Sequence, residues 1–214
     1  MVERQYSFLD NLIGAVDNAV RTLAGTPVVT ERANPADGLP EGALSEQERK
    51  VAAGLMRVNH AGEVSAQGLY QGQALTARLP DVREKMERAA LEENDHLAWC
   101  EQRVHELNEG VSLLNPVWYL GSFCIGAAAG AAGDKWSLGF VAETEHQVIK
   151  HLDDHLQRLP PQDTKSRAIV YQMTLDEAHH ATVALAHGGA QLPLPIRGIM
   201  AATSKVMTTL AYRI

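Results

Sequence analysis

The sequence predicts an all-α protein, built as a four-helix bundle with one long crossover and further helices at both ends. Helix-favouring Ala, Leu, Glu and Gln are plentiful, whereas aromatic residues make up only 5% of the 214 residues. Apolar residues recur with helical spacing in several long stretches. Glutamate and histidine recur on four of these stretches in a repeated order. At 45% hydrophobic residues, the chain can bury a sizeable core as one domain.

The N-terminal part is expected to differ from the remainder of the chain. Residues 7–24 place apolar side chains near one side of a helix and predict a short amphipathic helix. Residues 25–43 are rich in proline and glycine and predict a linker. We therefore assign residues 1–44 to an N-terminal helix and linker, and residues 45–214 to the bundle domain.

The four long helices have recognisable start and stop signals. Ser45 and Glu48 form a capping box, and Asp81 with Glu84 repeats a capping pattern after Pro80, which ends the first helix. Proline or glycine pairs follow the third and fourth helices. The expected bounds of the four helices are residues 45–78, 81–110, 134–158 and 163–187.

Residues 110–133 form a run of 24 residues without a charged side chain. Its length would allow a membrane span, but its many glycines and alanines favour close helix packing instead. A bundle whose second and third helices run parallel needs a long crossover at this position, as ferritin-like folds have. We therefore expect residues 111–133 to form a crossover, with a membrane span or partial insertion at the bilayer surface as the alternatives.

The C-terminal part combines an apolar helix face with positive charge. A helix is predicted over residues 195–212, and no acidic residue follows Glu177, whereas Arg197, Lys205 and Arg213 are basic. Because the whole chain has a net charge of −7, this tail suggests a surface that faces anions. Residues 192–214 therefore fit an interfacial membrane helix, with core packing or a subunit contact as the alternative.

Composition also limits the class of protein. The negative charge argues against general nucleic-acid binding. Cys100 and Cys124 form no C-x-x-C motif, so we expect a reduced, cytosol-like compartment and a packing role for both. The acidic N-terminus is typical of neither a signal peptide nor a transit peptide.

Each half of the chain contains one lone glutamate followed by a Glu-x-x-His pair, at spacings of 30 and 32 residues. The six residues are Glu63, Glu93, His96, Glu145, Glu177 and His180. Positions i and i+3 share one face of a helix, so each pair can reach the same metal ion. A four-helix bundle supplies this ligand set to a carboxylate-bridged di-iron or di-manganese site.

A third Glu-x-x-His pair, Glu143 with His146, has to be distinguished from the other two. Glu145 has apolar residues at all its i±3, i±4 and i±7 positions, whereas Glu143 shares its face with polar residues such as Lys150. We therefore expect Glu145 to point into the core and Glu143 to lie at its edge. Buried carboxylates need cations, which two divalent metal ions would supply; otherwise each glutamate must reach water.

The segments that carry these residues resemble the demethoxyubiquinone hydroxylases. They are Arg57-Val58-Asn59-His60-Ala61-Gly62-Glu63, Glu93-Asn94-Asp95-His96, Glu145 and Glu177-Ala178-His179-His180. The first string is the most specific, because ferritins and rubrerythrins do not usually carry it. The resemblance covers about residues 45–214 and leaves the first 44 largely unexplained.

The resemblance implies a di-iron enzyme that adds the last ring hydroxyl in ubiquinone biosynthesis. It implies that the six residues bind two iron ions, with Glu93 and Glu177 bridging them, and that O₂ hydroxylates the ring of a 2-polyprenyl-3-methyl-6-methoxy-1,4-benzoquinol. The electrons would come from the quinol or from NADH, although the chain has no G-x-G-x-x-G motif. His151 matches a family histidine near the iron centre that is not a ligand. His60, three residues before Glu63, could hydrogen-bond a ligand.

Several alternatives stay open at the level of sequence. The polar face around Glu63 fits groups that orient ligands, a polar gate where substrate and O₂ enter, or a half-exposed outer helix. His105, His155, His179 and His187 are expected to be solvated or to cap helices. An iron-storage or peroxide-reducing bundle of the ferritin or rubrerythrin type is the main rival function, and a non-catalytic helical scaffold is the second.

The implied substrate predicts a location at a membrane, because a polyprenyl tail is held in the bilayer and not in water. We expect the protein to rest on the cytoplasmic face of a bacterial cell membrane through residues 192–214, with residues 111–133 as a second contact. A homo-oligomer or a complex of ubiquinone-biosynthesis proteins is a further expectation.

Overall fold

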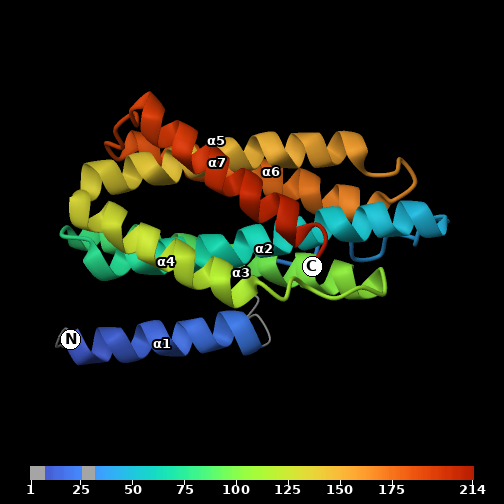
Figure 1. Ribbon diagram of the computed structural model, residues 1–214, viewed down its shortest axis with the longest axis horizontal. Coiled ribbons are helices and arrows are strands. Elements are labelled where there is room, and N and C mark those ends of the chain that lie inside the picture. The colour runs from blue at the N-terminus through green and yellow to red at the C-terminus, as the bar shows by residue number, and fades with distance from the viewer. Residues whose placement is uncertain (1–7, 26–31) are drawn as a thin grey trace.

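The computed structural model describes residues 8–25 and 32–214, and every regular element in these residues is an α-helix (Figure 1). The helices are α1 (Phe8–Ala24), α2 (Glu46–Thr76), α3 (Pro80–Glu106), α4 (Asn115–Ala132), α5 (Asp134–Arg158), α6 (Thr164–Ala186) and α7 (Leu194–Ala211). The predicted all-α class is confirmed.

Helices α2, α3, α5 and α6 form the four-helix bundle. In Figure 1, α3 and α5 run from left to right, whereas α2 and α6 run from right to left. Because α3 and α5 are parallel, the chain must return between them, and α4 makes this return along α2. The crossover expected at residues 111–133 is confirmed, and most of it is a helix.

Side chains close two of the helix starts as expected. The Ser45 hydroxyl accepts from the Glu48 backbone N–H, and the Glu48 carboxylate accepts from the Ser45 backbone N–H, which completes the capping box of α2. At the start of α6, the Asp163 carboxylate accepts from the Ser166 backbone N–H.

The cap predicted at Asp81 for α3 is wrong. Helix α3 begins one residue earlier, at Pro80, and no side chain caps it. Proline suits the first helical position because the N–H it lacks would have no partner within the helix. The Asp134 carboxylate instead accepts from the backbone N–H groups of Arg78 and Leu79, both at 3.0 Å, and fixes the turn before α3.

Helices α2 and α4 approach so closely that their backbones nearly touch. A Cβ atom at Gly72 would lie 2.2 Å from the carbonyl oxygen of Phe123, and one at Gly126 would lie 2.1 Å from that of Leu69. The expectation that the small residues of this segment serve close packing is therefore confirmed. With α1, α3, α5 and α7 also in contact with it, α2 is the central helix of the protein.

The terminal helices pack on the bundle from outside. Ala19 and Leu23 of α1 contact a buried cluster around Leu97. At the end of α7, Ala211 is fully buried and the Tyr212 ring rests against Gly54 of α2. The predicted additional helices at both ends are confirmed.

The outer faces of α4 and α7 expose large apolar side chains. They are Val117, Leu120 and Ile125 on α4, and Leu194, Ile196, Ile199, Val206 and Leu210 on α7. Across the described ranges, 8–25 and 32–214, none of the helices combines the length and the apolar character that crossing a membrane requires.

The close approach of α2 and α4 predicts opposite effects for two glycine substitutions in α4. Gly126→Ala forces a methyl group against the α2 backbone and should lower the free energy of unfolding by about 2–3 kcal/mol. Gly121→Ala meets no atom within 4 Å and should raise it by up to about 1 kcal/mol, since alanine favours helix. Urea unfolding of both variants measures the difference, and equal effects would contradict the packing.

Candidate metal centre

Glu63 lies near the middle of α2 and is only 3% exposed. The polar face around it is buried as well, and consists of Met56, Asn59, His60, Gln67 and Tyr70. The alternative of a half-exposed outer helix is therefore wrong, because α1, α4 and α7 cover α2. This polar face lies inside the protein, where its groups can hold other buried polar side chains in place.

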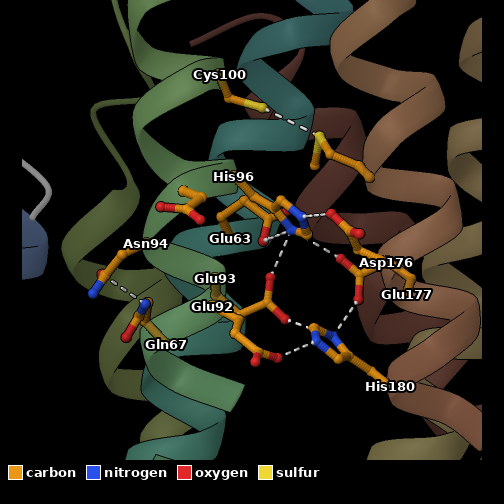
Figure 2. A network of polar contacts seen from close by, with 12 residues as sticks. Glu63, Gln67, Glu92, Glu93, Asn94, His96, Cys100, Asp176, Glu177 and His180 are labelled. Atoms are coloured by element: carbon orange, nitrogen blue, oxygen red, sulfur yellow. Dashed lines mark hydrogen bonds and ion pairs between the residues drawn. The ribbon is translucent and has the colours of Figure 1, made fainter. Parts of the chain in front are cut away.

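Three helices bring four of the predicted ligands into one cluster. Oxygen and nitrogen atoms of Glu63, Glu93, His96 and Glu177 all lie within 4.8 Å of one another, and the four side chains are buried. The His180 ring adjoins this cluster from α6, with its Nδ1 atom 3.1 Å from oxygens of both Glu93 and Glu177 (Figure 2).

Glu93 and Glu177 each span the two imidazoles. One Glu93 oxygen lies 2.8 Å from His96 Nδ1 and the other 3.1 Å from His180 Nδ1. The Glu177 oxygens lie 3.2 Å and 3.1 Å from the same two nitrogens. Two adjacent metal ions, each bound to one imidazole, would require this arrangement of two bridging carboxylates.

Glu145 of α5 points into the core, as its apolar face predicts. It is 3% exposed and accepts a hydrogen bond from the Tyr70 hydroxyl of α2. Glu143 lies outside the cluster, but the expectation that it sits at the edge of the core is wrong. It is 9% exposed because α7 covers it, and Arg197 of α7 forms an ion pair with it at 2.7 Å.

The charges at the site perturb each other strongly. Burial, reinforced by the charge of Glu93, raises the pKa of Glu63 well above its ordinary value. Burial and the charges of Glu177 and Glu93 do the same to the pKa of Glu145. Burial opposes a charged imidazole, yet the hydrogen bonds from His180 to Glu177 and Glu93 raise its pKa to about 12.

These pKa shifts arise because the six predicted ligands carry more negative than positive charge. Four carboxylates carry four negative charges when ionised, and two neutral imidazoles add none. Two divalent cations would balance this charge, and their binding requires ionised carboxylates and neutral imidazoles. The residues present therefore fit a di-metal centre.

Two acidic residues orient the histidines from behind. The Nε2 atom of His96 lies 2.9 Å from an oxygen of Asp176, and that of His180 lies 2.9 Å from an oxygen of Glu92. Each contact crosses between α3 and α6, as Figure 2 shows. A carboxylate on the far nitrogen fixes the ring and leaves Nδ1 to face the metal site.

These two acids were not among the predicted site residues, although the sequence contains a signal for them. Glu92 and Asp176 each directly precede the glutamate of a Glu-x-x-His pair, whereas Ala142 precedes Glu143. An acid at this position therefore separates the two clustered pairs from the third.

His60, expected to hydrogen-bond a ligand, and His151, expected near the iron centre, are not brought to the cluster. His60 faces α4, where its Nδ1 atom lies 3.4 Å from the Asn115 side-chain amide. His151 faces α7, with Nε2 3.0 Å from the Ser204 hydroxyl. Within the described residues, no hydrogen bond joins either histidine to the six predicted ligands.

The expectation for the remaining histidines and cysteines holds only in part. His105, His179 and His187 are exposed, as expected. His155 of α5 is buried, because it packs against α2 with Nδ1 2.7 Å from the Asn59 side-chain oxygen. Cys100 packs against Met173 in the core, but a packing role is wrong for Cys124, which is exposed on α4.

Two cavities approach the cluster and share Tyr70 and Met86 in their walls. The larger, about 410 Å³, lies between α1, α2 and α3, and Gln67 and Asn94 line it. The smaller, about 220 Å³, is lined by His180 and by residues of α3, α5 and α6. Small molecules therefore have space on two sides of Tyr70.

Comparison with known proteins identifies close relatives. The family model described as ubiquinone biosynthesis protein COQ7 matches residues 50–211. A Nitrosococcus oceani protein is 63% identical over 212 residues, 99% of each chain. One from Nitrosomonas eutropha is 57% identical over 204 residues, 95% of this chain and 98% of that one. One from Pseudomonas syringae pv. syringae is 56% identical over 212 residues, 99% of each. All three are named 3-demethoxyubiquinol 3-hydroxylase.

A solved structure shares the architecture at much lower identity. It is a dodecameric thioferritin, the bacterioferritin-related protein from Bacteroides fragilis. The TM-score is 0.56 and the identity 19%, over 72% of this chain and 90% of that one. This likeness shows that the bundle is ferritin-like.

The buried His155 predicts a loss of stability in acid. Burial lowers its pKa from 6.5 to about 4, so the unfolded chain binds a proton that the folded protein refuses. Its contribution is present above about pH 6.5 and should fall by about 2 kcal/mol between pH 7 and pH 5. Urea unfolding at several pH values measures this as wild type minus His155→Gln. A difference independent of pH would contradict a neutral buried imidazole.

Proposed function

The chain belongs to the COQ7 family of ubiquinone biosynthesis proteins, and on this premise we propose that it is a 3-demethoxyubiquinol 3-hydroxylase. It is an oxygen-dependent di-iron monooxygenase that hydroxylates the ring of a 2-polyprenyl-3-methyl-6-methoxy-1,4-benzoquinol. Its six metal ligands are Glu63, Glu93, His96, Glu145, Glu177 and His180. The single observation that carries the metal assignment is the pair of carboxylates, Glu93 and Glu177, that each span both imidazoles.

Bound iron would supply the reduction of O₂ and the transfer of one oxygen atom to the ring, with the other oxygen leaving as water. This reaction consumes two electrons and two protons; the quinol can provide all of them, whereas NADH provides the two electrons and one proton and the solvent provides the other proton. Glu93 and Glu177 would hold the ions, and Asp176 and Glu92 fix the orientation of the two imidazoles. The Tyr70 hydroxyl holds Glu145 by donating a hydrogen bond to it.

The larger cavity is the site that we assign to the quinol ring. Its volume of about 410 Å³ lies within the range of small-molecule sites, which is about 300–1,000 Å³. Gln67 and Asn94 in its wall offer hydrogen bonds to ring oxygens, and Met86 and Leu97 offer apolar contact. Tyr70 separates this space from Glu145, so a ring bound here lies next to the metal centre.

The outer faces of α4 and α7 form the membrane-docking surface of this proposal. Trp118 of α4 and Met207 of α7 pack on the same cluster over α2, so the two helices meet at this cluster. Their exposed apolar side chains are flanked by Arg197, Lys205 and Arg213, in a segment without acids. Apolar side chains beside cations fit the surface of an anionic bilayer, which also holds the polyprenyl tail.

We propose that the protein docks through this surface, as a peripheral protein, on the cytoplasmic face of a bacterial cell membrane. Association into a homo-oligomer, or with other proteins of ubiquinone biosynthesis, stays a prediction.

The metal assignment predicts that two glutamates of similar sequence context differ in importance. Glu177→Ala should lower iron content below two ions per chain and reduce formation of hydroxylated product more than a hundredfold. Loss of a residue behind a ligand already costs about 10–100-fold. Glu143→Ala is the matched control, since Glu143 is also buried and also opens a Glu-x-x-His pair. It should retain both the iron and the activity.

The measurement is aerobic turnover of a demethoxyubiquinol by the anaerobically purified, iron-loaded protein, with and without NADH. Equal product from wild type and Glu177→Ala would remove Glu177 from the site. Iron oxidation or peroxide reduction by wild type without ring hydroxylation would favour the ferritin or rubrerythrin alternative.

The docking surface predicts that charge on α7 weakens membrane binding. Ile199 and Val206 are 68% and 57% exposed, so glutamate at both should leave the fold intact. Burial of two such side chains contributes roughly 3 kcal/mol or more, hence vesicle binding should fall about a hundredfold. Co-sedimentation with anionic vesicles measures it, and Leu175→Glu on α6 is the control. Unchanged binding by the double variant would exclude α7 as the contact.

A further inference from the structure

Residues 32–44, which we call the strap, lie against α3 and α6 just before α2 begins. Ala36 is part of the main hydrophobic cluster, and Glu41 forms an ion pair at 2.8 Å with the buried guanidinium of Arg103 in α3. A Cβ atom at Gly42 would lie 2.1 Å from the carbonyl oxygen of Gln162, so the strap also fits closely against the turn before α6. The strap precedes the region that the family model matches, which begins at residue 50.

At its first residue the strap reaches the carboxylate behind a predicted metal ligand. Arg32 Nε lies 3.0 Å from Asp95 of α3, and one of its terminal nitrogens lies 2.6 Å from Asp176 of α6. The oxygen of Asp176 that Arg32 contacts is also the one that lies 2.9 Å from His96 Nε2. Arg32, Asp176 and His96 therefore form one continuous chain from the strap to the metal centre.

Ring contacts support the same chain. The Arg32 guanidinium lies 5.1 Å from the centre of the Trp99 ring, and this ring lies 5.4 Å from that of His96. Asp95 is fully buried and Asp176 is 16% exposed, so both carboxylates are largely shielded from water, whereas the Arg32 side chain is 38% exposed and stays in contact with solvent. An arginine suits the position because its planar fork can contact two carboxylates while it stacks on an aromatic face.

The other histidine shows what the strap contributes. Glu92, the carboxylate behind His180, is paired at 2.8 Å with Arg88, one turn earlier on the same helix. Each histidine is thus backed by a carboxylate and each carboxylate by an arginine. The bundle supplies the arginine on the His180 side, and the strap supplies it on the His96 side.

We propose that Arg32 is a positioning residue of the metal centre, which orients His96 through Asp176 and makes the strap part of the site. This proposal rests on the di-iron function proposed above. It assigns a role to a part of the N-terminal segment that sequence reasoning left unexplained. Because Arg32 acts through Asp176, its loss should weaken the hold on the metal bound by His96.

The test measures metal release from the full-length protein loaded with Co²⁺, whose visible absorption depends on the geometry of its ligands. Release to an excess of chelator is followed by stopped-flow absorbance. Arg32→Ala should change the absorption spectrum and speed release of one of the two ions about tenfold or more. Asn34→Ala is the matched control, because this strap residue bonds Gln102 of α3 but touches neither Asp95 nor Asp176. It should behave like wild type.

A double-mutant cycle separates positioning from simple loosening of the strap. If Arg32 acts through Asp176, the Arg32→Ala, Asp176→Asn double variant should release metal no more than about twofold faster than Asp176→Asn alone. Multiplicative effects of the two substitutions would overturn the proposal. Release of metal from Arg32→Ala at the wild-type rate, with two ions bound by the wild type, would also overturn the proposal. Failure of the wild type to bind metal would instead overturn the di-iron function on which the proposal rests.

Discussion

Mutual repulsion among four carboxylates in one buried volume is the constraint on which the rest of this structure depends. Each comes from a different helix, so the bundle cannot close without bringing the charges together. Burial and the neighbouring carboxylates raise the pKa values of Glu63 and Glu145, so both groups hold a proton more readily than they would in water. Because divalent cations would bind the folded site and not the unfolded chain, metal affinity would also appear as folding stability.

The surrounding helices exclude water from these carboxylates and fix their positions. Helix α4 can lie directly on α2 only because glycines of each helix face backbone atoms of the other, and α7 covers Glu143 and the outer side of α5. On the opposite side, the strap closes the seam between α3 and α6 next to His96. The side near His180 is more open, since a cavity reaches its ring and its supporting Arg88 is exposed. The two halves therefore share one ligand pattern but differ in their access to solvent.

Periodicity and local spacing predicted what depends on a single helix. The apolar neighbours of Glu145 were enough to prefer it to Glu143, and the charge-free run before Asp134 was enough to predict a crossover. Contacts that depend on two helices could not be predicted this way. The contact of Asp176 with His96 joins α6 to α3, and the contact of His155 with Asn59 joins α5 to α2. Arg32 is the extreme case, because it acts on a site 144 residues away in the chain.

In the proposed site, Glu93 and Glu177 together would bridge two metal ions. Anomalous diffraction at the iron absorption edge, from crystals loaded with ferrous iron without oxygen, measures this arrangement. We expect two peaks about 3.5–4 Å apart, with an oxygen of Glu93 and of Glu177 bound to each. A single peak, or two peaks that these glutamates do not share, would contradict it.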